Sequence, residues 1–266
     1  MKPVWRGRYW LVLGLIGVIG GFLSGMFGVG GGIVMVPLLV GLAKMDQRRA
    51  AATSLVAIVP ASLVGATTYA LNGHTDFVAG GFIVVGAVVG AIIGTRLLRR
   101  IPLSWLRWMF IALLVVVAAR LLLVAPIRGE AADLTAYIIV GYVVLGLFMG
   151  IASGLFGIGG GVIAVPGLIA LFGASDLIAK GTSLLVMLPT GIVGTVANLR
   201  AKLVDLRAGL VVGIAATLVS APGVAVALVI PPRLSGILFA GLLILAAVQL
   251  SIKAVRAQRR PRPVVS

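Results

Sequence analysis

The chain of 266 residues has no cysteine and only six acidic residues. Without cysteine it forms no disulfide, carries no thiolate nucleophile and holds no metal through sulfur. The six acids all lie between apolar runs or at their ends: Asp46, Asp76, Glu130, Asp133, Asp176 and Asp205. We therefore expect no buried carboxylate that would relay protons or bind sodium within a membrane.

Charged residues of both signs make up only 11% of the chain, whereas 61% of the residues are hydrophobic and the mean hydropathy is +1.23. This composition leaves too little polar surface for a water-soluble globule. Lipid offers the backbone no partner outside a helix or a closed barrel, and a helical span needs about 20 to 25 residues. The sequence thus predicts an all-α integral membrane protein of about eight spans. No nucleophile, base or metal cluster stands out, so we expect neither an enzyme nor a cofactor.

The basic residues give a formal net charge of +16, but they lie in short clusters beside apolar runs. Clusters in that position anchor spans to anionic lipid headgroups, so the expected partner is a lipid bilayer and not nucleic acid. The start of the chain, with Lys2, Arg6 and Arg8 before an apolar run, also resembles a signal peptide. We expect it to be retained, because the same apolar segment recurs at Gly146 to Gly154 and no small-residue cleavage site follows the first copy.

One glycine-rich motif occurs twice, 129 residues apart. The first copy, SGMFGVGGG, begins at Ser24 and precedes Pro37; the second, SGLFGIGGG, begins at Ser153 and precedes Pro166. The same offset aligns further residues without a gap, among them Thr53-Ser54 with Thr182-Ser183, Pro60 with Pro189 and Asp76 with Asp205. We predict a single transmembrane transporter domain over 1–266, with internal repeats at about 9–125 and 136–254 and a basic cytoplasmic tail at 255–266.

The distribution of basic residues indicates how the glycine-containing segments lie in the membrane. If every apolar piece crosses once, twelve basic residues are cytoplasmic and eight lie outside. If both glycine segments are hairpins that return to the side where they began, the count is seventeen inside, three outside and two within a span. The positive-inside rule favours the hairpins. The prediction is two inverted repeats, each a glycine-broken helical hairpin plus three transmembrane helices, with both termini cytoplasmic.

The glycines of the motif allow one helix to end near the middle of the membrane and a second, short helix to begin there. The first amides of that second helix, together with its dipole, form a site for a small anion. Two inverted copies would bring the two glycine turns together. The candidate substrate-binding residues are Ser24, Phe27, Gly28, Gly30, Gly31, Gly32, Thr53 and Ser54 in the first repeat, and Ser153, Phe156, Gly157, Gly159, Gly160, Gly161, Thr182 and Ser183 in the second.

Other interpretations of these residues remain open. Transmembrane helices also use glycine for close packing, which is the role we expect for two series spaced by four residues, Gly17 to Gly25 and Gly86 to Gly94. A dinucleotide-binding loop is a weak alternative, because no strand precedes the glycines. Thr53-Ser54 and Thr182-Ser183 open the next span in each repeat, where they either cap the helix or contact the substrate.

Two polar residues break the symmetry of the repeats. Lys180 aligns with Ala51; it either attracts an anion or, as we favour, extends its amine to the membrane interface. Asn198 aligns with Tyr69, and the sequence assigns it no role.

The paired glycine segments, each followed by a proline and then by Thr-Ser, resemble the TauE/SafE sulfite exporter family of membrane permeases. The resemblance covers the chain from about Leu11 to Ile252. It implies an integral membrane protein with several spans. It also implies a substrate among sulfite, sulfonates such as sulfoacetate and other sulfur-containing anions.

Together these features predict a secondary transporter of a prokaryotic plasma or inner membrane that exports a small, sulfur-containing anion by alternating access. An anion that leaves a cell with a negative interior gains about 2.3 kcal/mol per charge per 100 mV, so export needs no coupling ion. The alternatives are a passive anion channel and a non-transporting membrane scaffold or assembly protein. The sequence predicts no particular oligomeric state.

Overall fold

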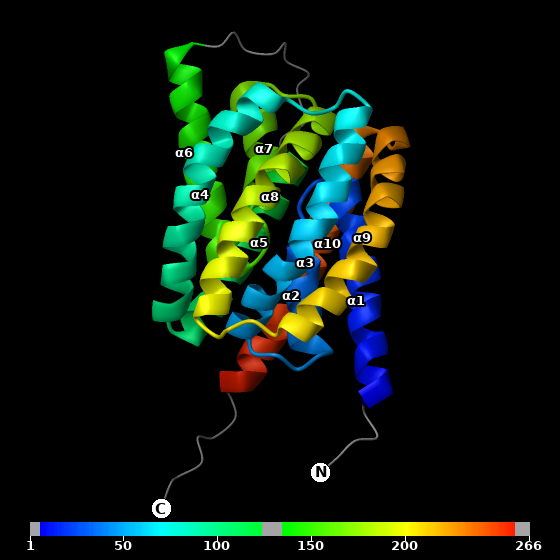
Figure 1. Ribbon diagram of the computed structural model, residues 1–266, viewed down its shortest axis with the longest axis vertical. Helices are drawn as coiled ribbons and strands as arrows, with labels where there is room; N and C mark the ends of the chain where they lie inside the picture. Colours follow the sequence, from blue (N-terminus) through cyan, green and yellow to red (C-terminus); the bar gives the residue numbers. More distant parts are fainter. Residues whose placement is uncertain (1–5, 124–134, 259–266) are drawn as a thin grey trace, which may run out of the picture.

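The computed structural model describes residues 6–123 and 135–258. Within these ranges the chain forms ten helices and no strand (Figure 1): α1 Arg6–Phe27, α2 Gly32–Gly41, α3 Gln47–Leu71, α4 Phe77–Arg100, α5 Leu103–Leu123, α6 Ala136–Phe156, α7 Gly161–Phe172, α8 Asp176–Arg200, α9 Leu206–Val229 and α10 Pro232–Gln258. The predicted all-α architecture is confirmed. Lys2, Arg128, Glu130, Asp133 and the tail beyond residue 258 lie outside the described residues.

Eight of the described helices, all except α2 and α7, are long and apolar enough to cross a membrane. The outer surface of the bundle is also apolar. Leu11 on α1, Leu218 on α9 and Leu245 on α10 expose 76%, 74% and 70% of their surface. Because such a dense set of exposed aliphatic side chains suits lipid and not water, the chain is that of a multi-pass membrane protein, as predicted.

The short helices α2 and α7 form hairpins with the helices that precede them. α2 folds back along α1, which places Met35 on α2 beside Gly20 on α1. α7 folds back along α6 in the same way, which places Gly167 beside Leu145. The predicted glycine-broken helical hairpin is therefore present in each half of the chain.

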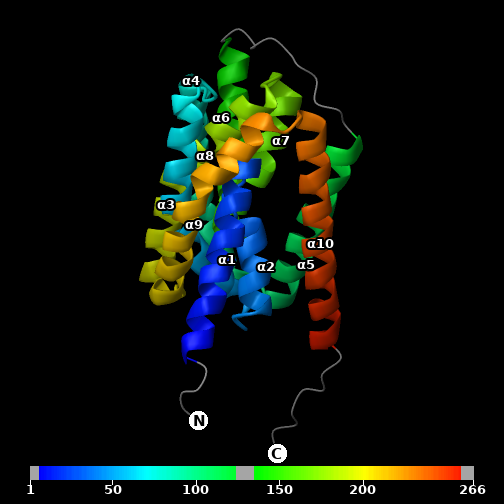
Figure 2. The same ribbon diagram turned by 90° about the vertical axis from the view of Figure 1, so that its right-hand side faces the viewer.

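The two hairpins enter the bundle from opposite ends. In Figure 1, α1 begins and α10 ends at the lower end of the molecule, whereas α6 begins at the upper end, and Figure 2 shows the same arrangement from the side. Inverted repeats require this kind of arrangement. The orientation of the repeats relative to a membrane, and the cytoplasmic position of both termini, stay predictions.

Each hairpin packs closely against a helix of the other half of the chain. On α1, a Cβ atom at Gly25 would overlap the carbonyl oxygen of Ser220 on α9 and lie 3.0 Å from the backbone nitrogen of Val224. On α4, a Cβ atom at Gly90 would lie 2.8 Å from the backbone nitrogen of Ile151 on α6. The packing role predicted for these two glycine series is confirmed, because only glycine lets the backbones approach so closely.

Aspartate and serine side chains begin the helices that follow the hairpins. The Asp46 carboxylate accepts hydrogen bonds from two backbone N–H groups in the first turn of α3, and the Ser175 hydroxyl accepts one in the first turn of α8. Thr53 and Thr182 lie about two turns further along these helices. The expectation that the Thr-Ser pairs open the spans is wrong, because the caps start both helices in the polar segment that precedes the apolar run.

Candidate functional site

Both glycine motifs form a tight turn between two helices. Positive φ angles occur at Gly28 (68°), Gly30 (74°) and Gly31 (68°), and at the equivalent Gly157 (69°), Gly159 (78°) and Gly160 (86°). Glycine adopts this left-handed conformation readily, whereas any residue with a Cβ atom is strained there. Gly31 and Gly160 are also the N-caps of α2 and α7, so each turn leads directly into a helix N-terminus.

The two turns are in direct contact with each other, as the sequence predicted. A Cβ atom at Gly161 would lie 2.7 Å from the carbonyl oxygen of Gly28. A Cβ atom at Gly32 would overlap the carbonyl oxygen of Gly157 and lie 2.7 Å from Ile158 Cα. The N-termini of α2 and α7, which are the positive ends of two helix dipoles, therefore meet in the interior of the protein.

Six backbone N–H groups in these turns make no hydrogen bond to the described part of the chain: those of Val29, Gly30, Gly31, Ile158, Gly159 and Gly160. All six residues are buried. Buried N–H groups without an acceptor are rare in proteins. A set of such donors suits a ligand rich in acceptors, and the two helix dipoles favour a ligand that is negatively charged.

Two apolar side chains that the sequence analysis did not single out cover both turns. A Cβ atom at Gly30 would lie 2.5 Å from Met187 Sδ and 3.3 Å from Ile58 Cγ2; at Gly159 the same atoms would be 2.9 Å and 3.3 Å away. Ile58 on α3 and Met187 on α8 are fully buried. They are equivalent positions of the two repeats, and this equivalence is the one signal in the sequence that could have identified them.

Each phenylalanine of the motif stacks on the last helix of the opposite half of the chain. Phe27 stacks on Phe239 of α10 with 4.9 Å between ring centroids, and Phe156 stacks on Phe110 of α5 with 5.3 Å. In this structure the two side chains thus attach α10 and α5 to the hairpins. Their contact with a substrate stays a prediction.

The four candidate serines differ in their hydrogen bonds. Ser54 donates to the carbonyl oxygen of Gly157 at 2.6 Å, which links α3 to the second glycine turn. Ser24, Ser153 and Ser183 are fully buried, and their hydroxyl groups have no hydrogen-bond partner among the described residues. These three hydroxyls are therefore free to bind a ligand.

The two candidate threonines have a structural role. The Thr53 hydroxyl accepts a hydrogen bond from the backbone N–H of Asp205 at 3.0 Å, and the Thr182 hydroxyl accepts one from that of Asp76 at 2.9 Å. Asp205 and Asp76 are the N-caps of α9 and α4. Each threonine thus fixes the start of a helix from the other half of the chain.

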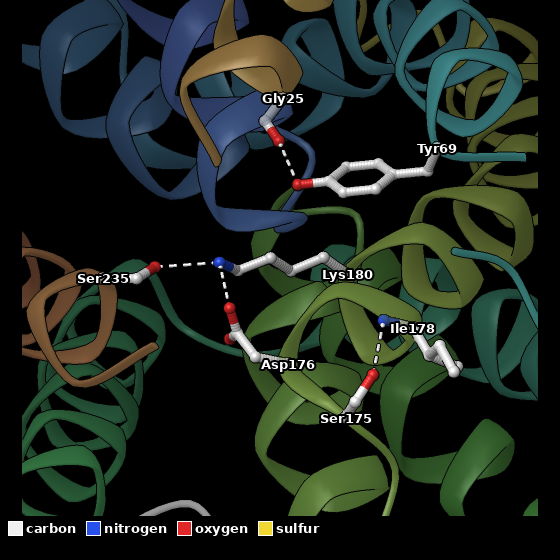
Figure 3. Close-up of polar contacts among 7 residues, drawn as sticks. All are labelled: Gly25, Tyr69, Ser175, Asp176, Ile178, Lys180 and Ser235. Carbon is white, nitrogen blue, oxygen red and sulfur yellow. Dashed lines mark hydrogen bonds and ion pairs between the residues drawn. The ribbon is translucent and has the colours of Figure 1, made fainter. Parts of the chain in front are cut away.

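Lys180 lies beside the first glycine turn, and its side chain is buried instead of extending to the surface of the protein. Its side chain is only 2% exposed, and its ammonium forms an ion pair with Asp176 at 2.6 Å. The ammonium also donates to the Ser235 hydroxyl on α10 at 2.8 Å (Figure 3). The expectation of an interfacial lysine is wrong, because these two acceptors compensate for the loss of water around the charge. Asp176 is the first residue of α8, in agreement with the prediction that the acidic residues lie at the ends of the apolar runs. Its side chain is nevertheless only 14% exposed.

Tyr69 and Asn198, which occupy equivalent positions in the two repeats, also differ in their hydrogen bonds. The Tyr69 hydroxyl donates to the carbonyl oxygen of Gly25 at 2.9 Å (Figure 3). Asn198 is fully buried, and both polar atoms of its amide lack a partner in the part of the chain that the structure describes.

Eight apolar helices around two helix N-termini that meet at glycine turns define a class of protein: a helical membrane transporter with discontinuous helices. Among the described residues, no group of three or more histidine or acidic side chains could hold a metal ion. The family model described as "Sulfite exporter TauE/SafE" matches residues 2–121 and 142–266. The chain belongs to this family of membrane transporters.

Relatives in several bacteria carry names of the same kind. The chain is 30% identical to "Probable membrane transporter protein YdhB" of Bacillus subtilis over 202 residues, which are 73% of this chain and 79% of the relative. It is 26% identical to "Probable membrane transporter protein YunE" of the same organism, over 71% of this chain and 78% of the relative. It is 29% identical to a "Probable membrane transporter protein" of Xylella fastidiosa, over 70% and 72%. These names state a transporter and give no substrate.

Proposed function

We propose that this transporter exports a small, sulfur-containing anion, such as sulfite or an organosulfonate, through a site formed by the two glycine turns. The observation that carries the proposal is the set of six buried backbone N–H groups without an acceptor, three in each turn. Helix N-termini bind oxyanions through such amides. The buried hydroxyl groups of Ser24, Ser153 and Ser183 supply further donors in this proposal.

Alternating access is the mechanism that fits this arrangement best. The hairpins enter from opposite ends of the bundle, and the side chains of Ile58 and Met187 cover both turns. A small shift of α3 or α8, which carry these side chains, would open the turns towards one end of the molecule at a time.

Export follows from the charge of the proposed substrate and the charge of the membrane. The positive-inside rule places the end where α1 begins in the cytoplasm of a prokaryotic cell. An anion moving outwards across that membrane gains about 2.3 kcal/mol per charge per 100 mV. Efflux of the anion is therefore favourable without a coupling ion.

The test is transport by the purified protein in proteoliposomes, with sulfite, thiosulfate, sulfoacetate, taurine and uracil at defined membrane potential. We expect saturable transport of at least one of the anions, with counterflow, a rate that rises with an outward driving potential, and no transport of uracil. Single-channel currents without saturation would instead identify a passive anion channel.

Variants of the turns connect the transport to the proposed site. Gly31→Leu and Gly160→Leu should abolish transport, because both glycines have positive φ and their amides belong to the proposed donor set. Gly241→Leu on α10 is the matched control, since nothing lies within 4 Å of a Cβ atom there. A protein that moves no anion from the panel, and whose cellular activity tolerates both turn variants, would be a scaffold or assembly protein.

A further inference from the structure

The Lys180 side chain packs against the first glycine turn and contacts two polar side chains, and we refer to Asp176, Lys180 and Ser235 as the Lys180 cluster (Figure 3). Their equivalents in the first repeat, 129 residues earlier, are Gln47, Ala51 and Leu106. The second glycine turn therefore has no charged group in the corresponding place.

The Lys180 side chain runs across the first glycine turn towards α10. A Cβ atom at Gly28 would lie 2.5 Å, 2.6 Å and 2.8 Å from Cα, Cβ and Cγ of Lys180. The ammonium group then reaches the first turn of α10, where it meets Ser235. Ser235 lies one turn before Phe239, which stacks on Phe27 of the glycine motif. The aliphatic part of Lys180 thus lies against the glycine turn, and its positive charge lies at the start of α10.

Packing against a glycine turn does not require a lysine. Ala51 occupies the equivalent place at the second turn, where a Cβ atom at Gly157 would lie 2.5 Å from Ala51 Cα. A buried ammonium group is unfavourable unless it is paired, and a buried ion pair gives little net stability compared with apolar side chains of the same size. The charge of Lys180 therefore calls for a role other than stability.

We propose that the Lys180 ammonium binds the substrate anion beside the first glycine turn, and that the Asp176 carboxylate occupies the ammonium while no anion is bound. This inference rests on the proposed function, because it requires an anionic substrate. An oxyanion at this place would accept hydrogen bonds from the Lys180 ammonium and the Ser235 hydroxyl, as the Asp176 carboxylate accepts one from the ammonium now. The displaced carboxylate, which lies in the first turn of α8, would turn towards solvent near the positive end of that helix.

This exchange predicts opposite effects for the two partners of one ion pair. Lys180→Met removes the positive charge and should raise the half-saturating sulfite concentration about tenfold or more, the effect expected for a lost charge-assisted hydrogen bond. Asp176→Asn removes the internal competitor and should lower the half-saturating concentration several-fold. Lys180→Arg keeps the charge and should retain sulfite binding.

The measurement is thermal unfolding of the purified full-length protein, titrated with sulfite, together with the concentration dependence of sulfite transport in proteoliposomes. Asp205→Asn is the matched control, because it neutralises the carboxylate of a different ion pair, Arg49–Asp205 at 3.0 Å, and should leave sulfite affinity unchanged. An ion pair with a structural role alone would give lower unfolding temperatures in both Lys180→Met and Asp176→Asn, with unchanged half-saturating concentrations. That result would overturn the inference.

A double variant keeps the test decisive if a single variant fails to fold. Asp176→Asn combined with Lys180→Met leaves no unpaired buried charge, and it should fold and lose sulfite binding as Lys180→Met does. If the double variant bound sulfite with the same half-saturating concentration as the wild-type protein, the proposed role of Lys180 would be contradicted. If the wild-type protein moves or binds none of the panel anions, the proposed function itself fails, whereas normal wild-type transport with unaffected variants refutes only this inference.

Discussion

At the scale of the residue, Gly160 is under two independent constraints. Its φ is 86°, and a Cβ atom would lie 2.5 Å from the carbonyl oxygen of Met149. Gly160→Ala should therefore lower the free energy of unfolding by about 2 kcal/mol or more, from backbone strain and overlap together. Gly241→Ala on α10, with open space around it, should raise the free energy of unfolding by up to about 1 kcal/mol. Thermal unfolding in detergent measures the change in stability of both variants. Equal changes in the two variants would contradict the role of backbone strain and overlap at Gly160.

Two equivalent serines offer a second test at this scale, because only Ser54 has a hydrogen-bond partner. Ser54→Ala removes its bond to the carbonyl oxygen of Gly157 and should lower stability by about 1 kcal/mol. Ser183→Ala removes a hydroxyl that bonds to nothing in the described structure, so stability should stay within about 0.5 kcal/mol of wild type. Under the proposed function Ser183 contacts the substrate. Ser183→Ala should therefore raise the KM for transport while stability hardly changes. A Ser183→Ala protein with unchanged transport would remove Ser183 from the proposed site.

At the scale of the element, the close packing of α4 against α6 can be tested. Gly90→Leu should prevent this contact, since a Cβ atom there would already lie 2.8 Å from the backbone of α6, and the protein should aggregate or lose its sharp unfolding transition. Gly81→Leu on the same helix is the control, because nothing lies within 4 Å of a Cβ atom there. Size-exclusion chromatography in detergent compares the two; a monodisperse Gly90→Leu protein would show that α4 and α6 need not approach so closely.

Elements whose signal is local in the sequence were predicted well. The long apolar runs predict the spans, and the adjacent glycines predict the two helix breaks. The hairpins and the contact between the two turns follow from the distribution of basic residues and the inversion of the repeats. The starts of α3 and α8 were misplaced, because Asp46 and Ser175 lie in polar segments that carry no apolar periodicity. The position of Lys180 could not be predicted, because its acceptor Ser235 lies on α10, 55 residues further along the chain. Ile58 and Met187 were missed because their apolar side chains resemble any other side chain of a span.

At the scale of the whole molecule, the predicted orientation in the membrane can be tested at the two ends of α4. The chain has no native cysteine, so a single introduced cysteine is the only residue of the protein that a maleimide labels. Asn72→Cys, in the loop before α4, should react with a membrane-impermeant maleimide in intact cells, whereas Arg100→Cys should react only after permeabilisation. Both side chains are exposed. The reverse pattern of labelling would contradict the hairpin topology and the cytoplasmic termini.

The Lys180 cluster has a consequence for the resting state of the proposed carrier. Two identical inverted halves would give inward-open and outward-open conformations of equal free energy, so an empty carrier would populate both alike. The hydrogen bond from Lys180 to Ser235 joins α8 to α10 beside the first glycine turn, whereas Ala51, at the equivalent place beside the second turn, has no side-chain polar group that could form such a bond. Within the proposed alternating-access mechanism, this contact would stabilise one conformation of the empty carrier over the other, and an anion that binds Lys180 would weaken the contact.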